Sequence, residues 1–197
     1  MASGFLEVQG FSAALSAMDA MCKSANVTVK AVDTNNTPNP KEAIVPVVIQ
    51  IKVSGSVGDV EQALEAGRRT ALNTLPPKFV LTHSIAAEDR SLAGILKSGK
   101  LPPHRRSGKK YDALGCVDVQ TFASALVVVN TVTSNADVDV ADIKKYLGGT
   151  MVTLIFGGTV AAVHDAIEQA ATCSLEGKVK NSSVITNPHP ELYRFLG

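Results

Sequence analysis

The alternation of apolar and polar residues near the start of the chain predicts a strand followed by a helix. Residues 5–8, Phe-Leu-Glu-Val, alternate as the residues of a half-buried strand do. Apolar residues then recur at helical spacing, at Phe11, Ala14, Leu15, Met18, Met21, Cys22 and Ala25. We therefore expect a helix over this segment whose apolar side packs on a sheet.

Two runs rich in β-branched residues follow, and each predicts a strand. They cover residues 27–32 and 45–53, and the proline- and asparagine-rich residues 34–40 separate them. A second helix then has a clear start, because Ser56 stands at an N-cap position with Asp59 three residues later. Its expected inward residues are Val57, Val60, Leu64, Gly67 and Ala71.

The same pattern recurs in the second half of the chain. Residues 6–15 resemble residues 117–126 at a spacing of 111, whereas residues 55–60 resemble residues 158–163 at a spacing of 103. The first copy therefore carries eight more residues between these two landmarks. The second helix of the second copy has Thr159 as its cap and the inward residues Val160, Val163, Ile167 and Ala170. We expect the unequal stretch to carry the function.

Each copy is predicted to contain a strand, a helix, two strands, a helix, a strand and a short helix. Two helices on one face of a sheet of about four strands define the ferredoxin-like α+β class. We therefore expect two tandem ferredoxin-like domains, each an antiparallel sheet with helices on one face. They are assigned to residues 1–98 and 111–197, and residues 99–110 form a basic linker with proline and glycine. This linker is either a solvated connection or a contact for an acidic partner or a neighbouring subunit.

Composition narrows the class of protein without naming its function. Two small domains in 197 residues are each only modestly stable alone, and 45% hydrophobic residues with a mean hydropathy of +0.15 favour subunit contacts. No uninterrupted run of about 18 apolar residues is available to span a bilayer. The net charge of +1 disfavours a nucleic-acid binder. The first four residues lack the basic start and apolar stretch of a secretory signal, so we expect a cytoplasmic protein without membrane or nucleic-acid partners.

The side chains that carry catalysis or bind metals show no recognisable arrangement. The four histidines fall at no metal-ligand spacing: His83, His104, His164 and His189. Glu61 and Glu65 lie one helical turn apart, as do Asp165 and Glu168, but carboxylates on the outer side of an amphipathic helix are usually solvated. We therefore expect no enzymatic activity, no metal and no cofactor.

The three cysteines predict reduced, buried thiols. Their number is odd and none stands in a Cys-x-x-Cys pair, which disfavours a disulfide framework. Cys22 falls on the expected inward side of the first helix and Cys116 falls in an expected strand. Both are predicted to be core residues.

Three segments resemble one known family. Residues 19–27, DAMCKSANV, are similar to the D-A-M-x-K-A-A-N-V segment of bacterial microcompartment shell proteins. Residues 145–160, KYLGGTMVTLIFGGTV, resemble that family's E-K-I-G-S-G-L-V-T-V-I-V-R-G-D-V, and residues 184–192 resemble its V-I-P-R-P-H-P-E-L ending. The resemblance covers nearly the whole chain in both copies. The tandem arrangement implies the trimeric branch of the family, in which three two-domain chains imitate a hexagonal tile.

The resemblance implies that the loop after the second strand of every domain lines a central pore. In the second copy this loop contains Leu147, Gly148, Gly149 and Thr150. In the first copy it is the longer segment 34–47, and the polar residues assigned to the pore there are Thr34, Asn35, Asn36, Asn39, Lys41 and Glu42. Three such polar loops would narrow, cap or gate the opening, and the alternative is an ordinary surface excursion. Some tandem members hold an iron–sulfur cluster through a pore-loop cysteine, and neither loop here contains one.

The resemblance also implies residues at the edge of the tile. Lys23 matches a lysine that meets a neighbouring tile, and the other expected edge residues are Asn26, Asn187 and His189. The alternative for Lys23 is a modest interaction with the helix C-terminus. The second copy has Ser134 at the lysine position, and Ala87 and Asn187 replace the arginine of the family ending. Edge contacts are therefore expected to differ on alternate sides, as in a minority tile among other shell proteins.

These expectations converge on a structural protein of a bacterial microcompartment shell in the cytoplasm. We expect a homotrimer with a central pore for small metabolites, gated by the 34–47 loop, and other shell proteins as partners. The competing class is a small-molecule-binding regulatory module, because paired ferredoxin-like domains often bind metabolites between them. A nucleic-acid binder is disfavoured by the aromatic-poor strands.

Overall fold

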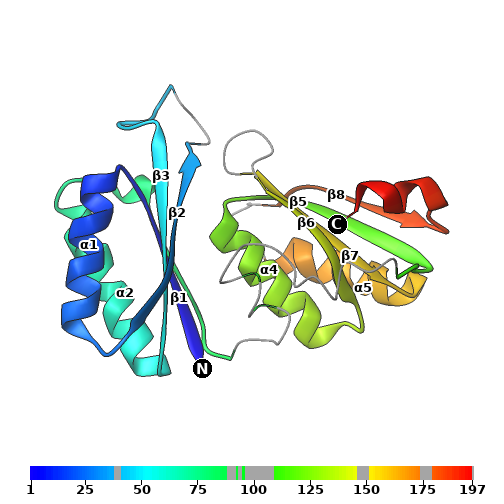
Figure 1. Cartoon of the computed structure of the whole chain (residues 1–197), viewed down its shortest axis with the longest axis horizontal. Coiled ribbons are helices and arrows are strands. Elements are labelled where there is room, and N and C mark those ends of the chain that lie inside the picture. The colour runs from blue at the N-terminus through cyan, green and yellow to red at the C-terminus, as the bar shows by residue number, and fades with distance from the viewer. Residues whose placement is uncertain are drawn as a thin grey trace. The chain divides into compact units, whose positions relative to one another are not determined.

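The computed structural model describes residues 1–37, 41–87, 92, 95, 109–145, 151–173 and 179–196, which belong to two compact units. The units are Met1–Glu88 and Asp89–Gly197 (Figure 1). The predicted end of the first domain at residue 98 and almost all of the predicted linker 99–110 lie outside the described residues. Those boundaries stay predictions.

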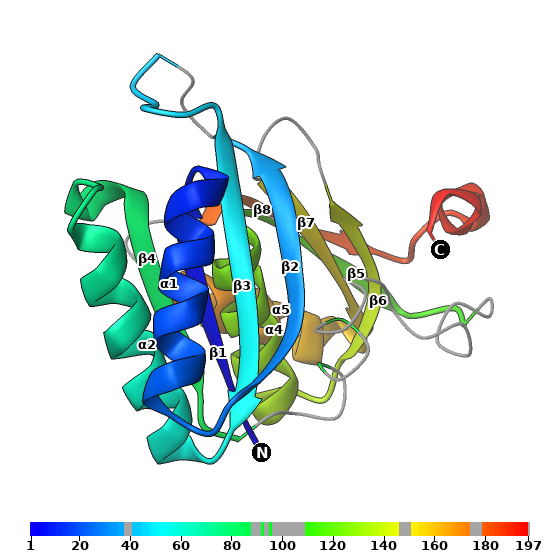
Figure 2. The ribbon, with the colours of Figure 1, turned by 60° about the vertical axis from the view of Figure 1, so that its left-hand side comes forward.

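The first unit has the strand–helix order that its hydrophobic pattern predicts. Its elements are β1 (Ala2–Gln9), α1 (Phe11–Ser24), β2 (Thr28–Asn36), β3 (Val47–Gly55), α2 (Val57–Leu72), the short 3₁₀ helix η1 (Pro77–Phe79) and β4 (Val80–Ile85). The strands form an antiparallel sheet in the order β2-β3-β1-β4. Both helices cover the same face of this sheet (Figure 2). This is the ferredoxin-like arrangement.

The second unit repeats the first. Its elements are β5 (Ala113–Gln120), α4 (Phe122–Asn135), β6 (Asp139–Lys145), β7 (Met151–Gly158), α5 (Val160–Cys173), β8 (Val179–Thr186) and the 3₁₀ helix η4 (Pro190–Phe195). The antiparallel sheet order is β6-β7-β5-β8, which is the order of the first unit. The predicted α+β class with two tandem ferredoxin-like domains is therefore confirmed.

The pairing of strands in the two sheets agrees with the two spacings between the repeats, 111 residues before the unequal stretch and 103 after it. Glu7 of β1 lies opposite Gln50 of β3, and Asp118 of β5 lies opposite Thr153 of β7. Both sheets also contain a bulge at the same place, between Val29 and Ala31 in β2 and at the corresponding residues of β6. The duplication thus extends to an irregularity that no hydrophobic pattern predicts.

The extra residues of the first copy lengthen the β2–β3 hairpin. β2 has 9 residues against 7 in β6, and β3 has 9 against 8 in β7. The connection between these strands covers 37–46 in the first unit and 146–150 in the second. In Figures 1 and 2 the end of the β2–β3 hairpin projects beyond α1.

Small side chains let the two helices of the first unit approach the sheet and each other. The buried residues of α1 are Ala14, Ala17 and Met21. Gly67 of α2 faces them, and a Cβ atom at this glycine would lie 2.6 Å from Cγ of Met21 and 3.0 Å from Cδ2 of Leu6. Any side chain at position 67 therefore requires the core to move.

The prediction for the inward side of α1 is partly wrong. Phe11 and Leu15 are 53% and 46% exposed, and Cys22 is exposed as well. The physical reason is that α1 carries two apolar stripes, and the stripe that faces the sheet contains Ala14 and Ala17, whose small side chains allow the closer approach. Cys22 is consequently not a core residue. None of the helices in the described part of the chain has the length and apolar character that a membrane crossing requires.

Candidate functional site

The predicted pore segment of the first unit forms the end of strand β2 and its connection to β3. Thr34, Asn35 and Asn36 are the last three residues of this edge strand, and Thr34 and Asn36 are exposed. Lys41 and Glu42 are also exposed. Asn39 lies outside the described residues. Polar side chains therefore dominate the solvent-facing surface of the hairpin end, where the apolar Ile44 is exposed as well.

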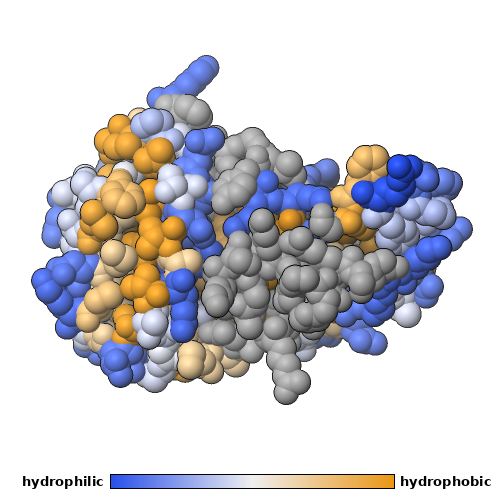
Figure 3. Space-filling model, in the orientation of Figure 1, coloured by the Kyte–Doolittle hydropathy of each residue, from blue (hydrophilic) through white to orange (hydrophobic). Residues whose placement is uncertain are grey.

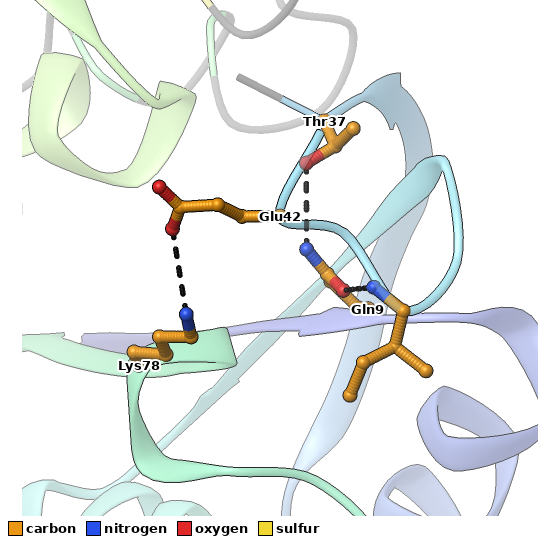
Figure 4. A network of polar contacts seen from close by, with 5 residues as sticks. Gln9, Thr37, Glu42 and Lys78 are labelled. Atoms are coloured by element: carbon orange, nitrogen blue, oxygen red, sulfur yellow. Dashed lines mark hydrogen bonds and ion pairs between the residues drawn. The ribbon is translucent and has the colours of Figure 1, made fainter. Parts of the chain in front are cut away.

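One buried side chain joins the two ends of this connection. Nε2 of Gln9 donates a hydrogen bond to Oγ1 of Thr37 at 3.3 Å, and Oε1 of Gln9 accepts one from the backbone N–H of Ile44 at 3.0 Å. Figure 4 shows the Gln9 side chain between these two partners. Two backbone bonds flank it, from Gly10 N–H to the Val47 carbonyl and from Thr37 N–H to the Pro46 carbonyl. The base of the connection is thus closed by four hydrogen bonds among these residues.

An ion pair lies on the flank of the same connection. Nζ of Lys78 is 3.4 Å from Oε2 of Glu42, and both side chains are exposed (Figure 4). Lys78 also lies over the ring of Phe79, with 4.9 Å from Nζ to the ring centroid. Exposed pairs of this kind contribute at most about 1 kcal/mol. The contact is therefore weaker than the buried hydrogen bonds of Gln9.

The predicted pore residues of the second unit, Leu147, Gly148, Gly149 and Thr150, lie outside the described residues. The strand residue before them is described. Nζ of Lys145 lies 4.2 Å from the centroid of the Phe122 ring, which places a cation over an aromatic face at this end of β6.

Two of the predicted edge residues, Lys23 and Asn26, lie close together in sequence at the C-terminal end of α1. Lys23 is exposed in the last turn of α1 and pairs with Asp19 at 2.7 Å. The backbone N–H of Asn26 donates to Oδ1 of Asp59 at 3.2 Å, and the Ser56 hydroxyl donates to Oδ2 at 2.6 Å. The Ser56 hydrogen bond, followed by that of Asn26, lowers the pKa of Asp59. Ser56 also accepts from the Asp59 N–H, so the predicted N-cap is confirmed.

The other two predicted edge residues shape the C-terminal turn of the second unit. Asn187 has a φ of 48°, in the left-handed region, and its N–H donates to the Asp112 carbonyl at 2.8 Å. Nδ1 of His189 accepts from the Glu191 N–H at 3.3 Å and caps η4. Both residues therefore have a local structural role, and their edge role stays a prediction.

A surface that the sequence analysis missed runs along α1. The helix has three sides: a buried side of Ala14, Ala17 and Met21, a polar side of Ser12, Ser16, Asp19 and Lys23, and an outward apolar stripe of Phe11, Leu15 and Cys22. Met18 lies beside this stripe and is partly buried against the core. Figure 3 shows hydrophobic side chains gathered on the surface of this unit. The residues of α4 at the first two stripe positions, Phe122 and Leu126, are only 4% and 1% exposed. The spacing of the stripe is visible in the sequence, but periodicity alone does not tell it from the inward side.

The remaining titratable groups form no catalytic arrangement in the described part of the chain. Burial lowers the pKa of His83 and raises the pKa values of the Cys116 and Cys173 thiols. Burial also lowers the pKa of Lys52, which pairs with Asp33 at 2.5 Å. The predicted solvated carboxylates are exposed, at Glu61, Glu65, Asp165 and Glu168. Among the described residues no three His, Cys, Asp or Glu side chains come close enough to hold a metal ion.

Comparisons with known proteins cover both units. The family model of the BMC domain matches residues 2–87 and residues 113–188. The bacterial microcompartment shell protein PduT of Citrobacter freundii is 26% identical over 195 residues, which cover 98% of this chain and 96% of the relative. The crystal structure of a microcompartment protein from Desulfitobacterium hafniense has a TM-score of 0.73 at 22% identity, with 98% of both chains covered, and shares the fold.

Proposed function

Because this chain belongs to the BMC domain family and carries two such domains in tandem, we propose that it is a structural protein of a bacterial microcompartment shell in the cytoplasm. Two findings support the proposal. The family match covers each unit separately, as the sequence resemblance predicted, and the shell protein PduT aligns with this chain over nearly its full length. The protein has no catalytic activity of its own in this proposal, and other shell proteins are its partners.

The proposed assembly is supported mainly by the unequal burial of α1 and α4, which occupy equivalent positions in the two repeats. Phe122 and Leu126 of α4 are buried, whereas Phe11 and Leu15 of α1 are about half exposed. We propose that a second copy of this chain covers the exposed stripe of α1. A contact of this kind joins two different surfaces of identical subunits. It produces a closed ring when the rotation from one subunit to the next closes on itself. The ring that we propose has three chains and six quasi-equivalent domains.

The energy of such a contact favours association. Complete burial of a Phe or Leu side chain contributes about 1.5–3 kcal/mol, so the half that remains exposed represents about 1 kcal/mol for each residue. Cys22 extends the exposed stripe into the last turn of the helix. The contact repeats at every interface of a closed ring. Each copy then has its own α1 stripe covered by one neighbour and covers the stripe of the other.

In this ring the β2–β3 and β6–β7 connections converge on the axis, where we propose a pore for small metabolites. The residues assigned to its lining are Thr34, Asn35, Asn36, Asn39, Lys41, Glu42, Leu147, Gly148, Gly149 and Thr150. The polar, exposed end of the β2–β3 hairpin supports this assignment. The longer first loop then narrows or gates the opening.

We assign the edge of the tile to Lys23, Asn26, Asn187 and His189. Lys23 supports the assignment, because it is exposed and its ion pair among the described residues is with Asp19 on its own helix. Such a pair contributes about 0.5 kcal/mol or less to the fold. Lys23→Ala is therefore expected to leave the trimer intact and to weaken packing between tiles.

A crystal structure of the assembled protein tests the proposed pore. We expect residues 37–46 at the threefold axis, and deletion of residues 38–41 is expected to enlarge the opening. An unchanged opening in the deletion variant would count against a gating role for this loop. Placement of residues 37–46 on the outer rim would contradict the pore itself.

A further inference from the structure

The connection 37–46 depends on one side chain that comes from a different strand. Gln9 is the last residue of β1, and it is 4% exposed. Its partners Thr37 and Ile44 stand on either side of the connection, 28 and 35 residues away in sequence. A single buried amide thus spans the loop at its base.

The chemistry of these contacts fixes the orientation of the amide. The Ile44 N–H is a donor only, so the atom facing it is the Gln9 carbonyl oxygen, and the NH₂ group therefore faces the Thr37 hydroxyl. Thr37 is itself 4% exposed, so neither group has free access to water. Loss of one partner leaves a buried polar group unsatisfied, which is more costly than the bond itself is favourable.

We propose that Gln9 is the positioning residue of the β2–β3 connection. It holds Thr37 and Ile44 together and thereby sets where Lys41 and Glu42 stand. The exposed pair between Glu42 and Lys78 is secondary, because solvent screens it. That these residues line a pore rests on the proposed function; the positioning role of Gln9 does not.

The second repeat supplies a matched control. Gln120 of β5 occupies the position of Gln9, at the spacing of 111 residues, and it is half-buried. Gln120→Leu removes the same amide from the other unit and leaves the Thr37 and Ile44 contacts untouched. Any general effect of replacing a glutamine at the end of a strand is therefore measured separately from the loss of the Gln9 hydrogen bonds.

Hydrogen exchange of the full-length assembled protein tests the proposal at the Ile44 amide. Gln9→Leu is expected to speed this exchange by about tenfold, because two hydrogen bonds are lost. Thr37→Val is expected to speed it by about threefold, less than Gln9→Leu, because the bond from Ile44 to Gln9 is kept. Gln120→Leu is expected to leave it unchanged.

Equal exchange at Ile44 in Gln9→Leu and Gln120→Leu would overturn the proposal. If Gln9→Leu does not fold, Thr37→Val is the test. The proposal is then overturned if the Ile44 amide exchanges no faster in Thr37→Val than in Gln120→Leu. The two proposals fail separately. A crystal structure with residues 37–46 away from the axis would refute the pore while leaving the exchange result intact.

Discussion

Phe11 of α1 and Phe122 of α4 occupy the same position in the two repeats, yet the first is 53% exposed and the second 4%. Each begins its helix directly after a residue with positive φ, Gly10 at 85° and Thr121 at 77°. The backbone is thus repeated in detail while the environment of the ring is not. This inequality is the physical basis on which we propose an interface between copies.

Charge on the outward stripe is expected to break the assembly. Leu15→Asp places a carboxylate in the proposed interface, where desolvation without a partner costs several kcal/mol. We expect the sedimentation coefficient to fall to that of a single chain. Ser16→Asp is the matched control, because Ser16 lies on the polar side of the same helix, and it is expected to sediment like the wild type. Equal sedimentation of both variants with the wild type would exclude the stripe as an interface.

Thiol labelling reports on the same surface without changing it. Cys22 is exposed in the single chain, whereas burial raises the pKa values of Cys116 and Cys173 and makes both less reactive. In the assembled wild type we expect Cys22 to be protected by the neighbouring copy. In Leu15→Asp we expect one thiol to react rapidly, and peptide mapping should identify it as Cys22. Rapid labelling of Cys22 in the assembled protein would contradict the proposed contact.

Two glycines of α2 are expected to respond oppositely to alanine. A Cβ atom at Gly67 would clash with the buried Met21, so Gly67→Ala is expected to lower the free energy of unfolding by about 1 kcal/mol even after the gain in helix propensity. Gly58 has no atom within 4 Å of the added Cβ, and Gly58→Ala is expected to raise it by about 0.5 kcal/mol. Urea unfolding measures both. Stabilisation by Gly67→Ala would mean that the helices pack less closely than described.

Stability is expected to fall below neutral pH because of His83. Burial lowers its pKa in the folded chain, so the unfolded chain takes up a proton at a higher pH than the folded chain. The contribution of the neutral ring is therefore complete above the unfolded pKa of about 6.5 and is lost as the pH falls from there toward the folded pKa. Urea unfolding at pH 7.5 and 5.5 checks this. His83→Gln should lose less stability over that interval, and an unchanged loss would assign the effect to other groups.

The hydrophobic pattern predicted the order of strands and helices because each element shows its own period. It also located the difference in length between the two copies. Glu7 corresponds to Asp118 at the first predicted spacing, and Gln50 corresponds to Thr153 at the second. Local chemistry such as the Ser56 cap was equally predictable, because its partner lies three residues away.

Two features could not be predicted from the sequence, for physical reasons. The first is which apolar stripe of α1 faces the sheet, because Ala14 and Leu15 have the same periodicity and only the closeness of packing selects between them. The second is the role of Gln9, because its contacts join residues 28 and 35 positions apart and depend on the register of three strands. The pore and edge assignments rest on the family resemblance and stay predictions.

Sedimentation equilibrium of the wild-type protein tests threefold closure most directly. The single chain has a mass of 20.6 kDa, and we predict a species of about three times that mass that persists on dilution. A monomer at all working concentrations would contradict the account.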